Sequence, residues 1–304
     1  MNKKYLVFPL ISIALIGCSG IKAPDFEPYS KKVTADKFAD AFEKSGFDDY
    51  LNFEKSTYGS SYTGYEIEHT EKVDNVVLLE VNGIEENNST FKFDKENNIS
   101  LSTRREKTDY SVSGATGIKN QSVSAYSINR QYQFHEFEEG NKLVSIDKDQ
   151  KVYYLADSDR PEIIASEPTI NMSKYELGLY SWTNYTGDVN SKFYFYVDNQ
   201  VFTVIQETKI TENDKDLGIK DEITSSLVYQ YQIVNEDTIL FRLSLENKAV
   251  TTYTKSGDNH AKGEVDTVSV KIYHTMEVHV ANVSLQAIDL STFAFRGADL
   301  DEAL

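Results

Sequence analysis

Histidine is the residue type that most readily binds metals or transfers protons near neutral pH. The histidines of this chain are His69, His135, His260, His274 and His279. His274 and His279 fall in one predicted strand, where their odd spacing points them to opposite faces, so they cannot share a metal there. We interpret His274, on the apolar side of that strand, as a core histidine rather than a ligand.

Acidic clusters could suggest a metal site in several parts of the chain. The first cluster is Glu66, Glu68, His69 and Glu71. A strand would divide these residues between its two faces. Two other acidic clusters each resemble a fragment of a calcium loop. One contains Asp147 and Asp149, and the other contains Asp214, Asp216 and Asp221 around Gly218. Both fragments lack the glycine and glutamate that the loop needs at its sixth and twelfth positions. We predict charged strands and turns, with no metal and no cofactor.

Motifs for covalent catalysis are also missing from the sequence. There is no Gly-x-Ser-x-Gly elbow, no glycine-rich phosphate loop and no His-Glu-x-x-His motif. Paired carboxylates remain available, as in any acidic protein. We predict that the protein is not an enzyme, and an envelope hydrolase is the least favoured of three functional hypotheses.

Cys18, the only cysteine, follows a complete export signal. Lys3 and Lys4 form a positive start, and an apolar stretch from Tyr5 to Ile16 is of signal-peptide length. The segment Leu15-Ile16-Gly17-Cys18 resembles the lipobox of bacterial lipoproteins. The resemblance implies cleavage between Gly17 and Cys18, and a diacylglyceryl group on the Cys18 thiol.

The expected cellular location follows from this segment. Residues 1–17 would be a cleaved lipoprotein signal peptide, and lipidated Cys18 would anchor the chain on the extracytoplasmic side of a membrane or at the cell surface. One acyl chain binds a bilayer only weakly, whereas two or three form a stable anchor. The alternative is an ordinary secretory signal followed by an incidental cysteine.

The charge of the chain argues against nucleic-acid partners. The formal net charge is −17 at pH 7, and removing residues 1–17 would take away two lysines and no acid. Such a body repels phosphate backbones and anionic headgroups. The densest basic cluster, Arg104, Arg105 and Lys107, is flanked by acids.

Proline positions suggest the organisation of the chain. Residues 18–32, with Pro24 and Pro28, are predicted to be a lipidated tether. Pro161 and Pro168 bracket a predicted linker, 161–168, between β-rich halves at 33–160 and 169–304. Three short matches, near a hundred residues apart, suggest duplication of the halves or convergent strand patterns: residues 89–99 with 191–201, 117–119 with 218–220, and 131–134 with 230–233.

Each half is expected to begin with a helix. Thr34 can cap a helix over Ala35 to Ser45 that stops at Gly46, and Ser173 can cap a shorter one. Most of the rest alternates as antiparallel strand, most clearly from Val268 to Val280. Phe193 to Val197 is apolar at every position, as in a strand covered on both faces. Turns are predicted at 82–83, 139–141, 198–199, 235–237 and 257–259.

These features predict an α+β fold of mainly antiparallel, curved, half-barrel-like sheets, with one helix at the start of each of two repeats. The layout is similar to that of the half-barrel lipoprotein carriers and related lipid-binding lipoproteins. The segment from Ile288 to Phe295, with one Asp and two alternating Phe, is similar to their closing segment. The resemblance implies an apolar ligand held between the curved sheet and the helices.

The leading hypothesis is therefore a membrane-anchored, non-enzymatic lipoprotein that binds a lipid or another hydrophobic ligand. The chain contains 20 Tyr and 16 Phe, which could line such a site or simply fill a core. The second hypothesis is a surface interaction module for a protein or glycan partner.

Overall fold

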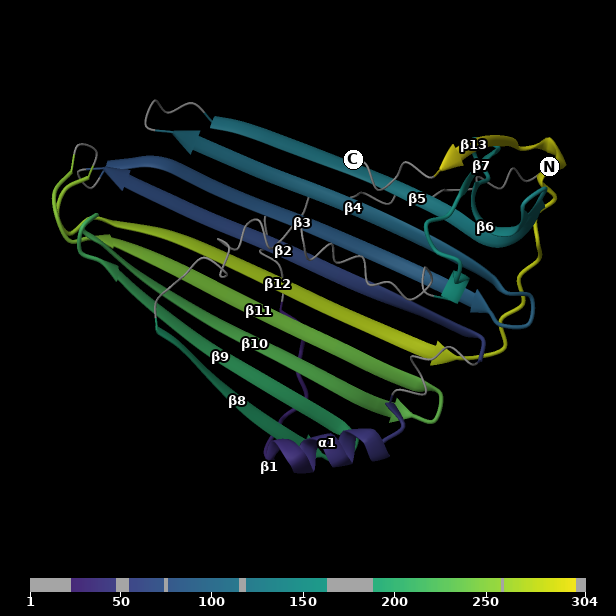
Figure 1. Ribbon diagram of the computed structural model, residues 1–304, viewed down its shortest axis with the longest axis horizontal. Helices are drawn as coiled ribbons and strands as arrows, with labels where there is room; N and C mark the ends of the chain where they lie inside the picture. The colour runs from purple at the N-terminus through teal and green to yellow at the C-terminus, as the bar shows by residue number, and fades with distance from the viewer. Residues whose placement is uncertain are drawn as a thin grey trace, which may run out of the picture.

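The computed structural model describes residues 23–47, 55–73, 76–114, 119–162, 188–257 and 260–298. Within them, the strands form one 13-stranded, curved and unclosed sheet (Figure 1). The strands are β1 Lys32–Val33, β2 Thr57–Val73, β3 Val76–Asp94, β4 Ile99–Gly114, β5 Lys119–Phe137, β6 Gly140–Asp147, β7 Val152–Leu155, β8 Asp188–Asp198, β9 Val201–Asp214, β10 Ile219–Asn235, β11 Thr238–Tyr253, β12 Val265–Val280 and β13 Ala294–Ala298.

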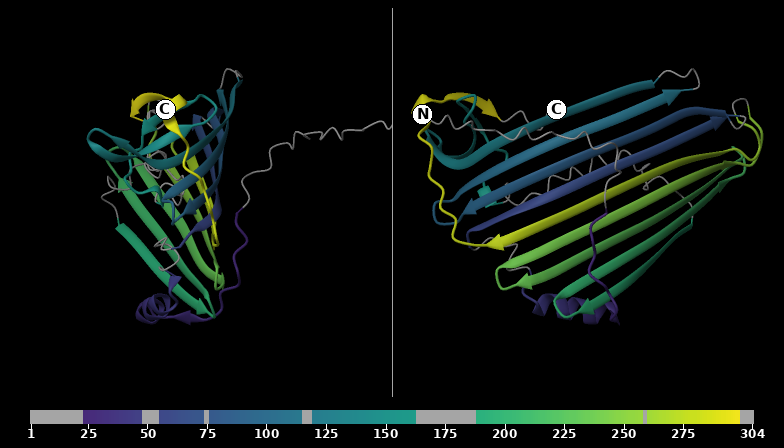
Figure 2. Two further views of the ribbon diagram at one scale, coloured as in Figure 1. Left: turned by 90° about the vertical axis from the view of Figure 1, so that its right-hand side faces the viewer. Right: turned by 180° about the vertical axis from the view of Figure 1, so that it is seen from behind.

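Two antiparallel meanders, β2–β7 and β8–β12, make up the sheet. They join where β12 pairs with β2, so both predicted halves contribute to one continuous sheet. Among the described strands, only β13 pairs in parallel, with β7. The long strands twist strongly across the sheet (Figure 2), as the handedness of L-residues requires.

Three hairpins share the same turn chemistry. Each begins with an Asp whose side chain accepts hydrogen bonds from the backbone N–H groups two and three residues later, and these are Asp94, Asp147 and Asp214. Each turn ends on a residue with positive φ, namely Asn98, Lys151 or Gly218. The calcium-loop fragments of the sequence are therefore hairpin turns that use Asp147 and Asp214 internally.

The α-helix α1 (Ala35–Lys44) lies against the lower end of the sheet in Figure 1. Thr34 caps its first turn, Ser45 ends it, and Gly46 takes a φ of 71°. These features confirm the predicted helix to within one residue. We call the side of the sheet that carries α1 the α1 face, and the other side the opposite face.

Terminal segments cover parts of the opposite face. Near β10, the Gln230 side chain accepts from the Glu27 backbone N–H at 2.7 Å and donates to its carbonyl at 2.9 Å. Near β5, Gln131 and Gln133 donate to the carbonyls of Gln286 and Ile288, both at 2.8 Å. Residues near Glu27 and Ile288 are thus tied to the sheet, although the former lie in the predicted tether.

The C-terminal segment continues into a small core at the β6–β7 end. The 3-10 helix η2 (Leu290–Thr292) leads into β13, and its Leu290 joins a buried cluster with Val144, Ile146 and Tyr153. Phe293 packs against this cluster, whereas Phe295 is 46% exposed.

Within the described part of the chain, no strand pairs with the outer edge of β5 along residues 120–127. β6 pairs only with residues 131–137 of β5, and residues 120–127 are all exposed. These eight residues carry no charge. Short, charged or bulged edges usually prevent association between sheets, and this edge has none of those devices.

Three sequence-based expectations need correction. The two-repeat prediction is wrong: the described chain has one α-helix rather than a helix at the start of each of two repeats. The second helix, from Ser173, lies outside the described residues, as do linker residues 163–168. The predicted turn at 82–83 falls inside β3, where a Cβ on Gly83 would lie 2.1 Å from the Tyr110 ring. Gly83 therefore makes room for a cross-strand aromatic ring.

The third correction concerns Phe193 to Val197. This segment is part of β8, which pairs on its outer side with only two residues of β1. Phe193 is 52% exposed, so the strand is not covered on both faces. The strand predicted from Val268 to Val280 is confirmed, since β12 contains these residues with the predicted alternation. The turns predicted at 139–141, 198–199 and 235–237 coincide with the ends of hairpins.

Candidate functional site

The α1 face carries a continuous apolar surface. Beside α1, Phe47, Phe91, Phe93, Ile233, Ile239 and Val278 form one buried cluster, with Tyr231 packed against it. The next cluster contains Tyr65, Leu243, Val270 and Ile272, with Leu227, Tyr229 and Phe241 packed against it. Because alternate residues of one strand share a face, Ile233, Tyr231, Tyr229 and Leu227 link the two clusters along β10. That run is about 20 Å long.

Helix α1 closes one end of the apolar surface. Its Phe38 and Phe42 both contact Phe202 edge-on, with ring centroids 6.1 and 5.3 Å away. Phe42 also meets Tyr231 at 5.2 Å. The helix is amphipathic, and aromatic side chains on one stripe hold it to the sheet.

Polar groups are embedded in the same face. His274 is 1% exposed; its Nδ1 lies 3.0 Å from Thr63 Oγ1, and its Nε2 has no hydrogen-bond partner among the described residues. Burial lowers the pKa of His274 to about 4, so the ring is neutral at pH 7. Burial, with Tyr110 and Glu85 nearby, raises the pKa of Tyr65 to about 12. Both side chains therefore add polarity without charge.

A buried ionic network lies farther along the α1 face, on β3, β4 and β5. Glu106 is 6% exposed and accepts hydrogen bonds from Asn87 Nδ2 at 3.1 Å and from the Tyr126 hydroxyl. Arg104 forms an ion pair with the same carboxylate. The α1 face thus changes from apolar near α1 to ionic at β3–β5. Such a surface suits an amphipathic ligand better than a purely apolar one.

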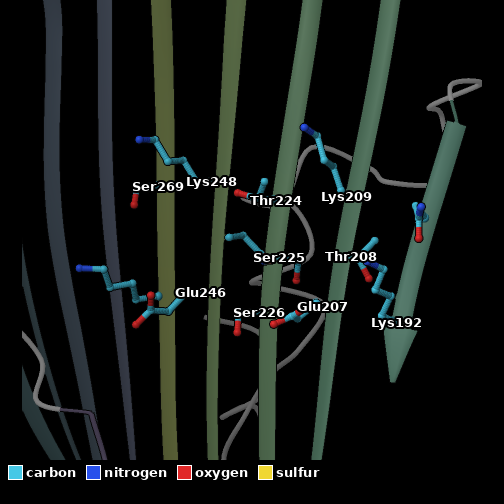
Figure 3. Close-up of a pocket in the computed structure, with 13 residues that line it drawn as sticks. Lys192, Glu207, Thr208, Lys209, Thr224, Ser225, Ser226, Glu246, Lys248 and Ser269 are labelled. Atoms are coloured by element: carbon cyan, nitrogen blue, oxygen red, sulfur yellow. The ribbon is translucent and has the colours of Figure 1, made fainter. Parts of the chain in front are cut away.

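A separate hollow of about 580 Å³ lies on the opposite face, across β8–β12 (Figure 3). Its lining is entirely polar: Asn190, Lys192, Glu207, Thr208, Lys209, Thr224, Ser225, Ser226, Glu246, Asn247, Lys248, Ser269 and Lys271. The four lysines come from four different strands. In Figure 3 the side chains of Lys209 and Lys248 project from β9 and β11 on either side of Thr224 on β10.

The structure places the histidines and acidic residues of the sequence analysis as follows. His274 is in the core, as predicted, and His279 lies on the other face, where its Nε2 is 2.8 Å from Glu277. Glu66 and Glu68 point to the opposite face, and His69 to the α1 face. Within the described chain, no group of three or more His, Cys, Asp or Glu side chains could hold a metal. Gly17 and Cys18 lie outside the described residues.

The ionic network and the lysine hollow were not found from the sequence. The four lysines are separated by up to 79 positions, and only the strand pairing brings them together. A signal was present, since each lysine directly precedes an apolar residue and so falls in the other strand phase, but strand order was needed to use it.

Among the described residues, no helix has the length and apolar character needed to cross a bilayer. No protein-family model and no curated protein sequence matches the chain.

Several solved structures are distantly similar. The outer membrane protease OmpT from Escherichia coli is 8% identical, covering 75% of this chain and 97% of its own, with a TM-score of 0.21. OprB from Pseudomonas putida is 8% identical, with a TM-score of 0.23, and the match covers 83% of this chain and 100% of the OprB chain. Lipovitellin is 10% identical, with a TM-score of 0.30, and the match covers 78% of this chain and 26% of the lipovitellin chain. Similarities at this level carry no argument about function.

Proposed function

We propose that this protein is a lipid-anchored envelope lipoprotein that binds a lipid, or another amphipathic molecule with an apolar chain, on the α1 face. The role is binding rather than catalysis. The observation that carries the proposal is the continuous apolar surface from α1 along β10–β12 and β2, followed by the network around Glu106.

The dimensions fit this class of ligand. One leaflet of a bilayer has acyl chains spanning about 15 Å, and the apolar surface measured across the strands from β10 to β2, in the direction of the ionic network, spans three interstrand distances, about 14 Å. Half-buried Tyr229, Tyr231 and Phe241 would contact the chain. Arg104 and the Tyr126 hydroxyl, at the ionic part of the face, would meet the polar end.

The ligand is tested with full-length protein purified from membranes in a mild non-ionic detergent. We expect lipid to be retained in stoichiometric amount after exhaustive washing, as measured by solvent extraction and mass spectrometry. The protein should also enhance the fluorescence of a conjugated polyene fatty acid. Absence of both signals would overturn the proposal.

Paired variants locate the ligand. Tyr229→Gln and Phe241→Gln should weaken fatty-acid binding at least tenfold, because each places an amide in the apolar surface. Tyr229→Leu should bind within about threefold of the unmodified protein, since it keeps an apolar side chain. Tyr194→Gln changes a tyrosine on the opposite face and serves as the matched control. Equal effects of Tyr194→Gln and Tyr229→Gln would place the ligand elsewhere.

The anchor is proposed on the sequence of residues 1–18 and has its own test. Cys18→Ser should abolish metabolic labelling by a radioactive fatty acid and leave the precursor unprocessed. Unchanged labelling would contradict lipidation at Cys18, whereas the fatty-acid assay would remain informative about the α1 face.

A further inference from the structure

Ten of the thirteen residues that line the hollow in Figure 3, here called the lysine hollow, form two cross-strand rows of opposite-face residues. One row runs Lys192, Glu207, Ser226, Glu246, Lys271 across β8–β12. The neighbouring row runs Asn190, Lys209, Thr224, Lys248, Ser269 across the same strands. Directly opposed residues have Cβ atoms about 5 Å apart, so each side chain in a row can contact its neighbours.

The two rows differ in charge balance. In the first row, Lys192 faces Glu207 and Glu246 faces Lys271, so each lysine has an acidic cross-strand neighbour. In the second row, both lysines are flanked only by amides and hydroxyls. The second row therefore carries two positive charges without a carboxylate of its own.

The contacts of these two lysines confirm the imbalance. Lys209 Nζ lies 3.8 Å from Glu222, and that carboxylate already pairs with Lys220 at 3.0 Å. Within the described chain, no carboxylate lies within 4 Å of Lys248 Nζ. Lys209 and Lys248 are both exposed.

Thr224 lies between these lysines, one strand from each. The Cα atoms of Lys209 and Lys248 are therefore about 10 Å apart, a span that two flexible lysine side chains can close over one group. The Thr224 hydroxyl is exposed at the centre and can donate to the same group. Two ammonium groups and a hydroxyl around one point form a site for an oxyanion.

We propose that the hollow binds a phosphate group carried by a polyhydroxylated molecule, that is, a sugar phosphate. Lys209, Lys248 and Thr224 hold the phosphate, and Ser226, Ser269 and Glu246 hydrogen-bond the hydroxyl groups. The volume of about 580 Å³ far exceeds that of a bare phosphate and falls in the range of small-molecule sites. Among the residues that the structure describes, no aliphatic or aromatic side chain lines the hollow, so neither an acyl chain nor a stacked base fits.

The site is independent of the apolar ligand because it lies on the other side of the sheet. The overall negative charge does not prevent phosphate binding. At physiological salt the screening length is about 8 Å, so the charges within the hollow determine the local potential.

Calorimetric titration of the full-length protein with glucose 6-phosphate, inorganic phosphate and glucose tests the proposal. Glucose 6-phosphate should bind saturably with a dissociation constant of about 1 mM or less, and more tightly than either of the others. Lys209→Gln/Lys248→Gln should weaken this binding at least tenfold, since it removes two charge-assisted contacts. Glu207→Gln should strengthen it, because a nearby repulsive charge is lost.

The matched control is Lys92→Gln/Lys107→Gln, which removes the same charge from the same face on β3 and β4. It should bind glucose 6-phosphate within about twofold of the unmodified protein. Equal weakening by both double variants would indicate a general charge effect and overturn the site. No saturable binding up to about 20 mM would also overturn it. Binding of inorganic phosphate alone, with equal affinity, would overturn the sugar and leave an oxyanion site.

Discussion

The clearest quantitative prediction concerns His274 and the pH dependence of stability. In the native sheet burial holds the pKa of His274 at about 4, against 6.5 for a solvated histidine. Above pH 6.5 the ring is neutral in both native and unfolded chains, so it adds no pH dependence. Between pH 6.5 and 4 the unfolded chain binds a proton that the native chain does not. The free energy of unfolding therefore falls as the pH falls through this window.

The magnitude follows from the size of the pKa change. Each pH unit inside the window costs about 1.4 kcal/mol, so the loss is about 2 kcal/mol by pH 5 and about 3 kcal/mol by pH 4. The hydrogen bond to Thr63 Oγ1 does not prevent the loss, because it also forms with the neutral ring. Asp94 and Asp147, whose pKa values are lowered below 3.8, contribute mainly below pH 4.

The assay is urea unfolding followed by far-ultraviolet circular dichroism, from pH 7.5 to 5. The reference is His274→Leu/Thr63→Val, which removes both partners and leaves no unpaired polar group. The four other histidines are present in both proteins, so they cancel in the difference. We expect this difference to be constant above pH 7 and to fall by about 2 kcal/mol at pH 5. Parallel curves over the whole range would refute the assigned burial of the ring.

Three further predictions concern packing, turns and the open edge. Gly59→Ala should lower the free energy of unfolding by about 1–3 kcal/mol, because its Cβ would lie 2.4 Å from both the Glu277 carbonyl and the Phe91 ring. Gly257→Ala should change it by less than about 0.5 kcal/mol, since no described atom lies within 4 Å of the added Cβ. Asp94→Ala should lower the free energy of unfolding by about 3 kcal/mol and Asp214→Ala by about 1 kcal/mol in the same assay. The difference arises because buried Asp94 also accepts hydrogen bonds from Leu285 N–H and Asn97 Nδ2. A larger loss for Asp214→Ala would contradict this. Ser124→Lys on the open edge of β5 should reduce concentration-dependent light scattering, whereas Asn88→Lys on inner strand β3 should not.

The local structure was largely readable from the sequence. Thr34 and Gly46 delimited α1 correctly, and the alternation from Val268 to Val280 identified β12 and the buried side of His274. Both signals depend on neighbours within one element. The signal at 82–83 failed because the glycine is explained by Tyr110 on the adjacent strand. The prediction that Phe193 to Val197 is covered on both faces failed for a related reason, because the composition of a strand does not show that it lies near the edge of a sheet.

The candidate sites depend on strand order, which alternation does not contain. Within each meander the order follows the chain, so neighbours such as Leu227 and Leu245 could have been paired from the turns alone. The β12–β2 contact joins residues about 200 positions apart, and it places His274 beside Thr63. That contact turns two apolar meander faces into one surface, and it leaves Lys271 beside Glu66 at the border of the hollow. A sequence specifies what each strand shows to its two sides, whereas the ligand chemistry of this sheet is decided by which strands lie next to each other.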